Sequence, residues 1–237
     1  MPAQSSSRRS ATRPRRVVVI IGESEYDTAT ISQLFRALRP DFTGAVRARK
    51  DPPLLIKNAT PGNLPNRANI LAALVRSEEL TADVVCALAH EDCDAVEPAH
   101  MALSNKIESL FKERGINAYA VTPAWEMETW LFLWPEASKQ YRPKWRRPDS
   151  YNGTNVGMLS DAKEKFKRAL RPSTPAARAG VRDYRESDAP MIAAKVLELA
   201  IIDRLSATSN SYTRFRDALR SCNLTESVVD QPDSSGR

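Results

Sequence analysis

Two uninterrupted apolar runs, each ending in acidic residues, constrain the fold of this chain more than any other feature. Residues 17–21 read Val-Val-Val-Ile-Ile and stop at Gly22-Glu23, and residues 84–89 read Val-Val-Cys-Ala-Leu-Ala and stop at His90-Glu91-Asp92. Short runs of this kind, bounded by polar residues, are typical of strands buried on both faces, as in parallel sheets. Neither run is long enough to span a membrane, and no membrane association is expected.

Stretches with helical spacing of apolar residues separate these strands. We predict helices ending at Leu38, over 66–80 and over 97–113, and a further strand over 116–121. Strands that alternate with amphipathic helices predict an α/β fold: a Rossmann-like core with a mostly parallel sheet flanked by helices. The signal then becomes helical, with helices expected over 126–133, over 160–170 with Ser160 as the N-cap, and after Asp188.

Composition along the chain predicts four segments. Residues 1–15 form a disordered basic tail, 16–122 the α/β core, 123–222 a helical and basic extension packed on that core, and 223–237 a flexible tail. The net charge of +6 owes much to five arginines within residues 1–16, so the rest of the chain is nearly neutral. An Arg- and Ser-rich start also resembles a transit peptide, but a solvated extension is the favoured interpretation.

Other patterns exclude several protein classes. The chain contains neither GxxxxGK[ST] nor GxGxxG, which argues against nucleotide-binding enzymes of those types. Its three cysteines lack CxxC spacing, so neither a disulfide scaffold nor a structural zinc site is expected. A reducing, cytoplasmic compartment is the natural expectation.

The acidic residues after the strands are the candidate catalytic centre. In an open parallel sheet ligands bind beyond the carboxyl ends of the strands, where Glu23, Asp92 and Asp94 would gather. Converging carboxylates repel one another unless a cation neutralises them, and hard oxygen ligands suit Mg²⁺ or Mn²⁺. The alternative is that such acids only cap the following helices, and Glu97 is open to both interpretations: a second-metal ligand, or compensation of a helix dipole.

A basic segment further along the chain is a candidate nucleic-acid surface. It interleaves cationic and aromatic side chains that could grip phosphates and stack on an unpaired base: Lys139, Arg142, Lys144, Trp145, Arg146 and Arg147. The alternative interpretation is a solvated loop whose tryptophan packs on the body of the protein.

These motifs, in this order, resemble the TOPRIM family. The matching pieces are Val17–Ser24, Val84–Asp94, the segment Pro123-Ala-Trp-Glu-Met-Glu128-Thr-Trp-Leu-Phe and the segment Tyr184-Arg-Glu-Ser-Asp-Ala-Pro190. The nearest likeness is to small stand-alone TOPRIM-like proteins, of the OLD or RloB type, from bacterial defence loci. The resemblance implies that Glu23 acts as an acid/base or metal-linked carboxylate, that Asp92 and Asp94 bind metal, and that Glu128 is a supporting catalytic carboxylate.

The resemblance implies an activity and partners as well. The chain is expected to be a Mg²⁺- or Mn²⁺-dependent nuclease that hydrolyses phosphodiester bonds in DNA or RNA, in antiphage defence with a partner ATPase. The alternative is a non-catalytic TOPRIM-like regulatory or scaffold subunit that binds a partner protein or nucleic acid. A third hypothesis is a metal-dependent phosphatase that acts on small molecules.

Overall fold

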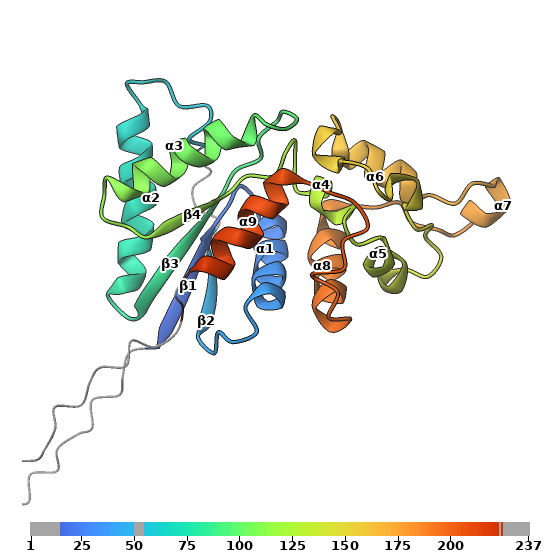
Figure 1. The fold of residues 1–237 in the computed structure, drawn as a ribbon, viewed down its shortest axis with the longest axis horizontal. Helices are drawn as coiled ribbons and strands as arrows, with labels where there is room; N and C mark the ends of the chain where they lie inside the picture. The colour runs from blue at the N-terminus through green and yellow to red at the C-terminus, as the bar shows by residue number, and fades with distance from the viewer. Residues whose placement is uncertain (1–14, 50–54, 223, 225–237) are drawn as a thin grey trace, which may run out of the picture.

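A computed structural model describes residues 15–49, 55–222 and 224 (Figure 1). The predicted tails, 1–15 and 223–237, fall almost entirely outside these residues. In chain order the strands and α-helices are β1 (Arg16–Ile21), α1 (Glu25–Leu38), β2 (Ala45–Arg49), α2 (Leu64–Glu79), β3 (Asp83–His90), α3 (His100–Lys112), β4 (Ala118–Val121), α4 (Glu128–Leu131), α5 (Pro135–Tyr141), α6 (Ala162–Leu170), α7 (Pro175–Arg178), α8 (Ala189–Glu198) and α9 (Asn210–Ser221). Short 3₁₀ turns cover Asp149–Tyr151, Val156–Met158 and Glu186–Asp188.

The predicted parallel sheet is confirmed. Its four strands run in the order β2-β1-β3-β4, and all three pairings are parallel. The carboxyl ends of the two central strands lie nearly level, with Ile21, the last residue of β1, opposite Ala89, the last but one of β3. The segments that leave these two strands therefore start side by side at the carboxyl edge of the sheet.

Each face of the sheet is covered by helices, which explains why the strand sequences are apolar throughout. Val17, Val19 and Ile21 of β1 enter one core with α2 and α3. Val18 and Ile20 enter a second core with α1, α8 and α9 (Figure 1). Alternate side chains of a strand point to opposite faces, so burial on both faces requires an apolar residue at every position.

The second core continues without a break into the C-terminal half of the chain. It includes Trp130, Trp134 and Phe166 together with the α1 residues Leu34 and Phe35. We call residues 135–188, which lie beyond α8 at the end of the molecule away from α2 and α3, the lobe (Figure 1). Residues 123–222 thus pack on the α/β core through shared apolar side chains.

Three predicted helix boundaries are wrong. The helix expected over 126–133 is only the single turn α4, and α3 starts at His100 rather than at 97. Ser160 does not cap α6: the cap position is Asp161, in a left-handed conformation with φ 50°. A distant carboxylate provides the cap instead, because the Lys163 backbone N–H donates to Oε1 of Glu126 at 2.6 Å.

None of the helices in the described part of the chain is long and apolar enough to span a bilayer.

Candidate functional site: the acidic edge of the sheet

The central strands bring two of the predicted acids into direct contact. Glu23 lies two residues beyond β1 and Asp92 two residues beyond β3. The backbone N–H of Asp92 donates to Oε1 of Glu23 at 2.9 Å. The expected convergence at the carboxyl edge of the sheet is therefore present for this pair. We call the group Glu23, Asp92 and Asp94 the acidic edge.

The side chain of Asp92 faces a buried histidine. Nε2 of His90 lies 3.3 Å from Oδ1 of Asp92, an ion-pair distance without hydrogen-bond alignment. Burial, the largest single effect, lowers the pKa of His90, but the carboxylates of Asp92, Asp27 and Glu23 together outweigh it and raise that pKa, Asp92 most of all. Oδ1 of Asp92 and both ring nitrogens of His90 are buried without a hydrogen-bond partner among the described residues. Buried polar atoms without partners are costly, so this position is suited to a water molecule or a cation.

A lysine that the sequence did not single out joins the other acids. Nζ of Lys57 lies 2.7 Å from Oδ2 of Asp94 and 3.2 Å from Oε1 of Glu23, and it donates to the Asp92 carbonyl oxygen at 2.8 Å. Burial lowers the pKa of Lys57, yet the two carboxylates outweigh this effect and raise it. The ammonium group of Lys57 therefore supplies one positive charge between Glu23 and Asp94.

Asp94 itself has an unusual backbone conformation. Its φ of 52° is in the left-handed region, which costs energy for most residues and less for Asp. Its N–H donates to the Trp125 carbonyl oxygen at 2.9 Å, and this bond fixes the turn after β3. Unfavourable conformations held by the surrounding structure are enriched at functional sites.

Further carboxylates surround Asp92 in a poorly solvated setting. Burial is the largest cause that raises the pKa of Asp27, of Glu91 and of Glu126. The negative charge of Asp92 contributes to the shifts of Asp27 and Glu126, which places both near it. Glu91 is tied down by the backbone N–H groups of Ile56 and Lys57, so its role is to hold that loop. Such a concentration of acids with raised pKa values is typical of functional sites.

Glu128 lies deeper, in a pair with a tyrosine. It is 5% exposed, and its Oε1 accepts a hydrogen bond of 2.8 Å from the Tyr184 hydroxyl. Burial raises the pKa of Glu128 to about 8, with a smaller contribution from the charge of Glu126. Glu128 is therefore largely protonated at neutral pH, and a direct metal contact would require it to lose that proton.

We expect this proton to make stability depend on pH. Between the ordinary value near 4.5 and about 8, folded Glu128 keeps a proton that the unfolded chain releases, so stability falls as pH rises. The slope is at most about 1.4 kcal/mol per pH unit. Gln cannot ionise but still accepts from Tyr184, so Glu128→Gln should flatten the dependence of the urea midpoint on pH between about 5 and 8.

The exposed Glu136→Gln on α5 is the matched control and should keep the wild-type slope. Equal slopes for the wild type and Glu128→Gln would contradict the assignment of a buried, protonated Glu128.

The carboxylates of the acidic edge have the chemistry that a divalent cation needs, but they are not arranged as a complete metal site. Carboxylate oxygens are the ligands that Mg²⁺ and Mn²⁺ prefer, and Oδ1 of Asp92 has no hydrogen-bond partner among the described residues, although Nε2 of His90 lies 3.3 Å away. Within the described ranges, however, no three His, Cys, Asp or Glu side chains form a group able to hold a metal. A cation between Glu23 and Asp94 would have to displace Lys57, whereas one at Asp92 would not.

No family model, no curated protein and no solved structure matches this chain. The resemblance to the TOPRIM family therefore depends on its short motifs and on the placement of their acidic residues.

The structure places two predicted site residues inside the protein instead. Glu97 is 4% exposed, and its carboxylate accepts hydrogen bonds from Ser209 Oγ and the Ser211 N–H, each at 2.8 Å, and from Asn155 Nδ2 at 3.1 Å. It is occupied in joining three segments, so the proposed role as a second-metal ligand has no support here.

Trp145 is 1% exposed, and its indole N–H donates to the Arg182 carbonyl oxygen at 2.8 Å. Its ring is not available to stack on a base, because it packs on the body of the protein. The cationic neighbours Lys144, Arg146 and Arg147 are exposed, and Arg142 is half-buried.

The sequence did not single out two residues of the candidate site. Lys57 belongs to no motif, and an isolated lysine carries no signal in a chain with many. Tyr184 stands only as the first residue of a TOPRIM-like segment, whereas its hydroxyl contacts Glu128, 56 residues away in sequence. Both depend on contacts between distant segments.

Proposed function

We propose that this chain is a metal-dependent nuclease that hydrolyses phosphodiester bonds in DNA or RNA at the acidic edge. The observation that carries the proposal is the meeting of Glu23 and Asp92 beyond neighbouring parallel strands, with a buried Asp92 oxygen that has no hydrogen-bond partner among the described residues. Asp92 would hold the cation, and Glu23 and Asp94 would join it once Lys57 is displaced from between them. When bound, a divalent cation supplies Lewis acidity and lowers the pKa of a coordinated water.

The surrounding side chains can support that chemistry. His90, whose pKa the Asp92 carboxylate raises, holds the Asp92 side chain in place and can carry a proton close to it. Lys57 supplies a positive charge at the same edge, suited to a phosphate oxygen. A partner ATPase and a role in antiphage defence belong to this proposal through the TOPRIM resemblance alone.

The test is a cleavage assay over a panel of substrates. Purified protein is incubated with Mg²⁺ or Mn²⁺ and with single- and double-stranded DNA and RNA, including tRNA, and each reaction is repeated in EDTA. We expect at least one substrate to be cut only when the metal is present. A generic phosphate ester in the same panel distinguishes a nuclease from a small-molecule phosphatase.

A second candidate is a regulatory or scaffold subunit without catalysis, and Lys57 favours it. An ammonium group that already pairs with Glu23 and Asp94 neutralises part of the acidic edge without a metal. This candidate predicts no cleavage in any arm and no metal-dependent heat in a calorimetric Mn²⁺ titration. Mn²⁺ binding together with metal-dependent cleavage would exclude it.

A further inference from the structure

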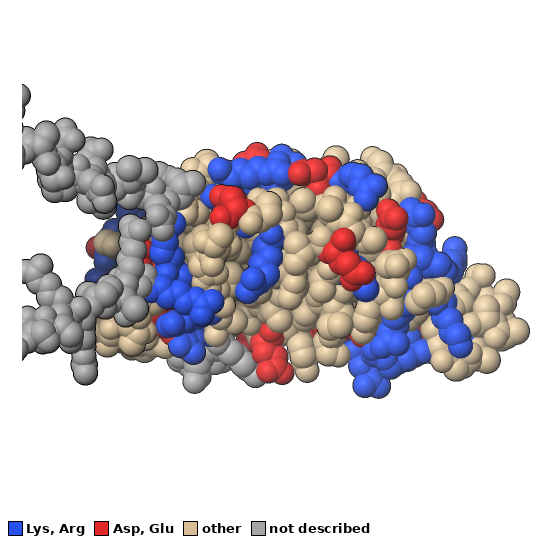
Figure 2. All heavy atoms as spheres, turned by 90° about the horizontal axis from the view of Figure 1, so that it is seen from below, with Lys and Arg blue, Asp and Glu red and all other residues tan. Residues whose placement is uncertain are grey.

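The lobe carries a strong excess of positive charge that the net charge of the chain conceals. The lobe, residues 135–188, contains thirteen Lys and Arg residues against seven Asp and Glu. Residues 16–122, which include the sheet, contain twelve against fourteen. In Figure 2 a group of Lys and Arg side chains lies next to the tan tip of the lobe, and other Lys and Arg side chains lie on the rest of that face. The chain is therefore divided into a slightly acidic body and a basic lobe.

Three cavities on the lobe collect these cations. The first, of about 450 Å³, is lined by Tyr26 of α1 and by residues of α6 and of the turn after Tyr184; its cations are Lys163, Lys167 and Arg185, and its acids are Glu164 and Glu186. The second and the third are each of about 360 Å³. Among the described residues, the second has the cations Arg142, Lys144 and Arg182 and no acid, and the third has Lys139, Arg146 and Arg147 with Asp149. By contrast, no Lys or Arg in the described part of the chain lines the cavity between the sheet and α2 and α3.

The second cavity has the features of a phosphate site. The Arg142 guanidinium lies over the rings of Tyr141 and Trp145, at 4.9 and 5.6 Å from their centroids, so its orientation is fixed. Its Nε is buried without a hydrogen-bond partner among the described residues. Asp188, which is 1% exposed, pairs with Arg182 and lies 3.9 Å from Arg142. One buried acid thus pairs with two of the three cations, so the cavity stays positive.

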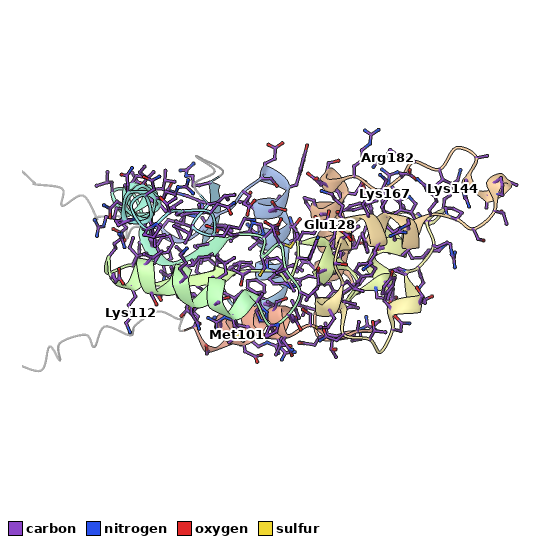
Figure 3. The ribbon with its side chains drawn as sticks, turned by 90° about the horizontal axis from the view of Figure 1, so that it is seen from above. Met101, Lys112, Glu128, Lys144, Lys167 and Arg182 are labelled. Carbon is purple, nitrogen blue, oxygen red and sulfur yellow. The ribbon has the colours of Figure 1, made fainter. Side chains whose placement is uncertain are left out.

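The first cavity connects this positive surface to the candidate active site. Tyr184, which lines it, donates to Glu128, and Lys163 pairs with Glu126. The negative charge of Asp92 contributes to the raised pKa values of both Glu126 and Glu128. In the view of Figure 3, Lys167, Arg182 and Lys144 lie on one side of the lobe, and Glu128 lies between them and the sheet.

We propose that the lobe binds the sugar–phosphate backbone of the nucleic-acid substrate through these three cavities, with the cavity of Arg142, Lys144 and Arg182 as a phosphate subsite. The proposal rests on the proposed nuclease function and names the surface that holds its substrate. Since Trp145 is buried, recognition goes through phosphates rather than through stacked bases, and binding tolerates any sequence.

The test measures binding without catalysis. Three fluorescently labelled probes, each 30 nucleotides per strand, are titrated with protein in EDTA: single-stranded RNA, single-stranded DNA and duplex DNA. Fluorescence anisotropy is recorded at several salt concentrations. One exposed cation from each cavity is reversed: Lys144→Glu, Arg146→Glu or Arg185→Glu. None of these three has an acid within ion-pair distance among the described residues, so folding should survive, and circular dichroism checks it.

We expect each reversal to weaken binding about five- to tenfold, equally for different sequences, and to lower the slope of log affinity against log salt by about 1. Lys112→Glu on α3, exposed at the opposite end of the molecule in Figure 3, is the matched control and should bind like the wild type. Wild-type affinity in all three lobe variants, an equal loss in Lys112→Glu, or no binding by the wild type would overturn the proposal.

The outcomes for binding and cleavage are separate. If the wild type binds through the lobe in EDTA but cuts nothing with metal, the binding surface stands and the nuclease proposal fails. If the wild type cuts nucleic acid and all three lobe variants bind and cut equally well, the nuclease proposal stands and the binding surface fails.

Discussion

Asp92→Asn should abolish metal-dependent cleavage while leaving the fold intact. Asn keeps the shape of the side chain and the backbone N–H that donates to Glu23. It removes the negative charge at the one carboxylate oxygen of the acidic edge that is buried without a hydrogen-bond partner among the described residues. Loss of the several kcal/mol that a bound cation supplies to the transition state corresponds to about a thousandfold in rate.

The measurement is the initial rate of cleavage of the substrate found in the panel, with Mn²⁺ affinity measured by calorimetry on the same preparations. Asp217→Asn on α9, whose side chain is 60% exposed, is the control for the same chemical change elsewhere. Thermal melting of all three proteins shows whether the fold is preserved. A folded Asp92→Asn variant whose initial cleavage rate is within threefold of the wild-type rate would contradict the assignment of the acidic edge as the catalytic centre.

Glu97→Ala should destabilise the protein by about 3 kcal/mol or more, even in EDTA, because three hydrogen bonds to a charged acceptor are lost. The Glu97 carboxylate is buried and joins the loop before α3 to Asn155 and to the start of α9. Its removal leaves the buried Ser211 N–H without this acceptor. A site that only bound metal would instead become more stable when a carboxylate is removed in the absence of metal, because repulsion between acids is relieved.

Urea denaturation in EDTA measures this effect. Glu113→Ala, an exposed residue just after α3 that pairs only with its neighbour Arg114 among the described residues, should change the free energy of unfolding by less than about 0.5 kcal/mol. Gly157→Ala offers a second probe of the same contact, since an added Cβ would lie 2.0 Å from the Glu97 carboxyl carbon. Unchanged stability in Glu97→Ala would return Glu97 to the list of candidate metal ligands.

Much of the fold followed from local patterns. The β-branched run of β1 and the apolar run of β3 predicted buried parallel strands, and the spacing of Ile31, Leu34 and Phe35 predicted α1. Helix ends were harder, because a cap can come from elsewhere in the chain. Glu126 caps α6 from 37 residues away, so the Ser160 cap expected from local sequence was wrong.

For the same reason, the sequence predicted only part of the candidate site. Acids directly after strands must lie at the carboxyl edge of a parallel sheet, so Glu23, Asp92 and Asp94 were accessible to sequence reasoning. Their catalytic role remains a prediction. The sequence also showed the basic segment. It did not show that Trp145 is buried or that Arg182 lines the same cavity as Arg142.

The sequence by itself determined which strands are buried on both faces and which residues leave their carboxyl ends, because alternation and apolar runs are encoded locally. Only the tertiary structure decided that β1 and β3 are neighbours, that Lys57 lies between Glu23 and Asp94, and that the basic residues divide among three cavities. These features depend on contacts between segments that are distant in the sequence. The packing free energy of the whole chain determines which segments make contact, and a short window of sequence does not contain that information.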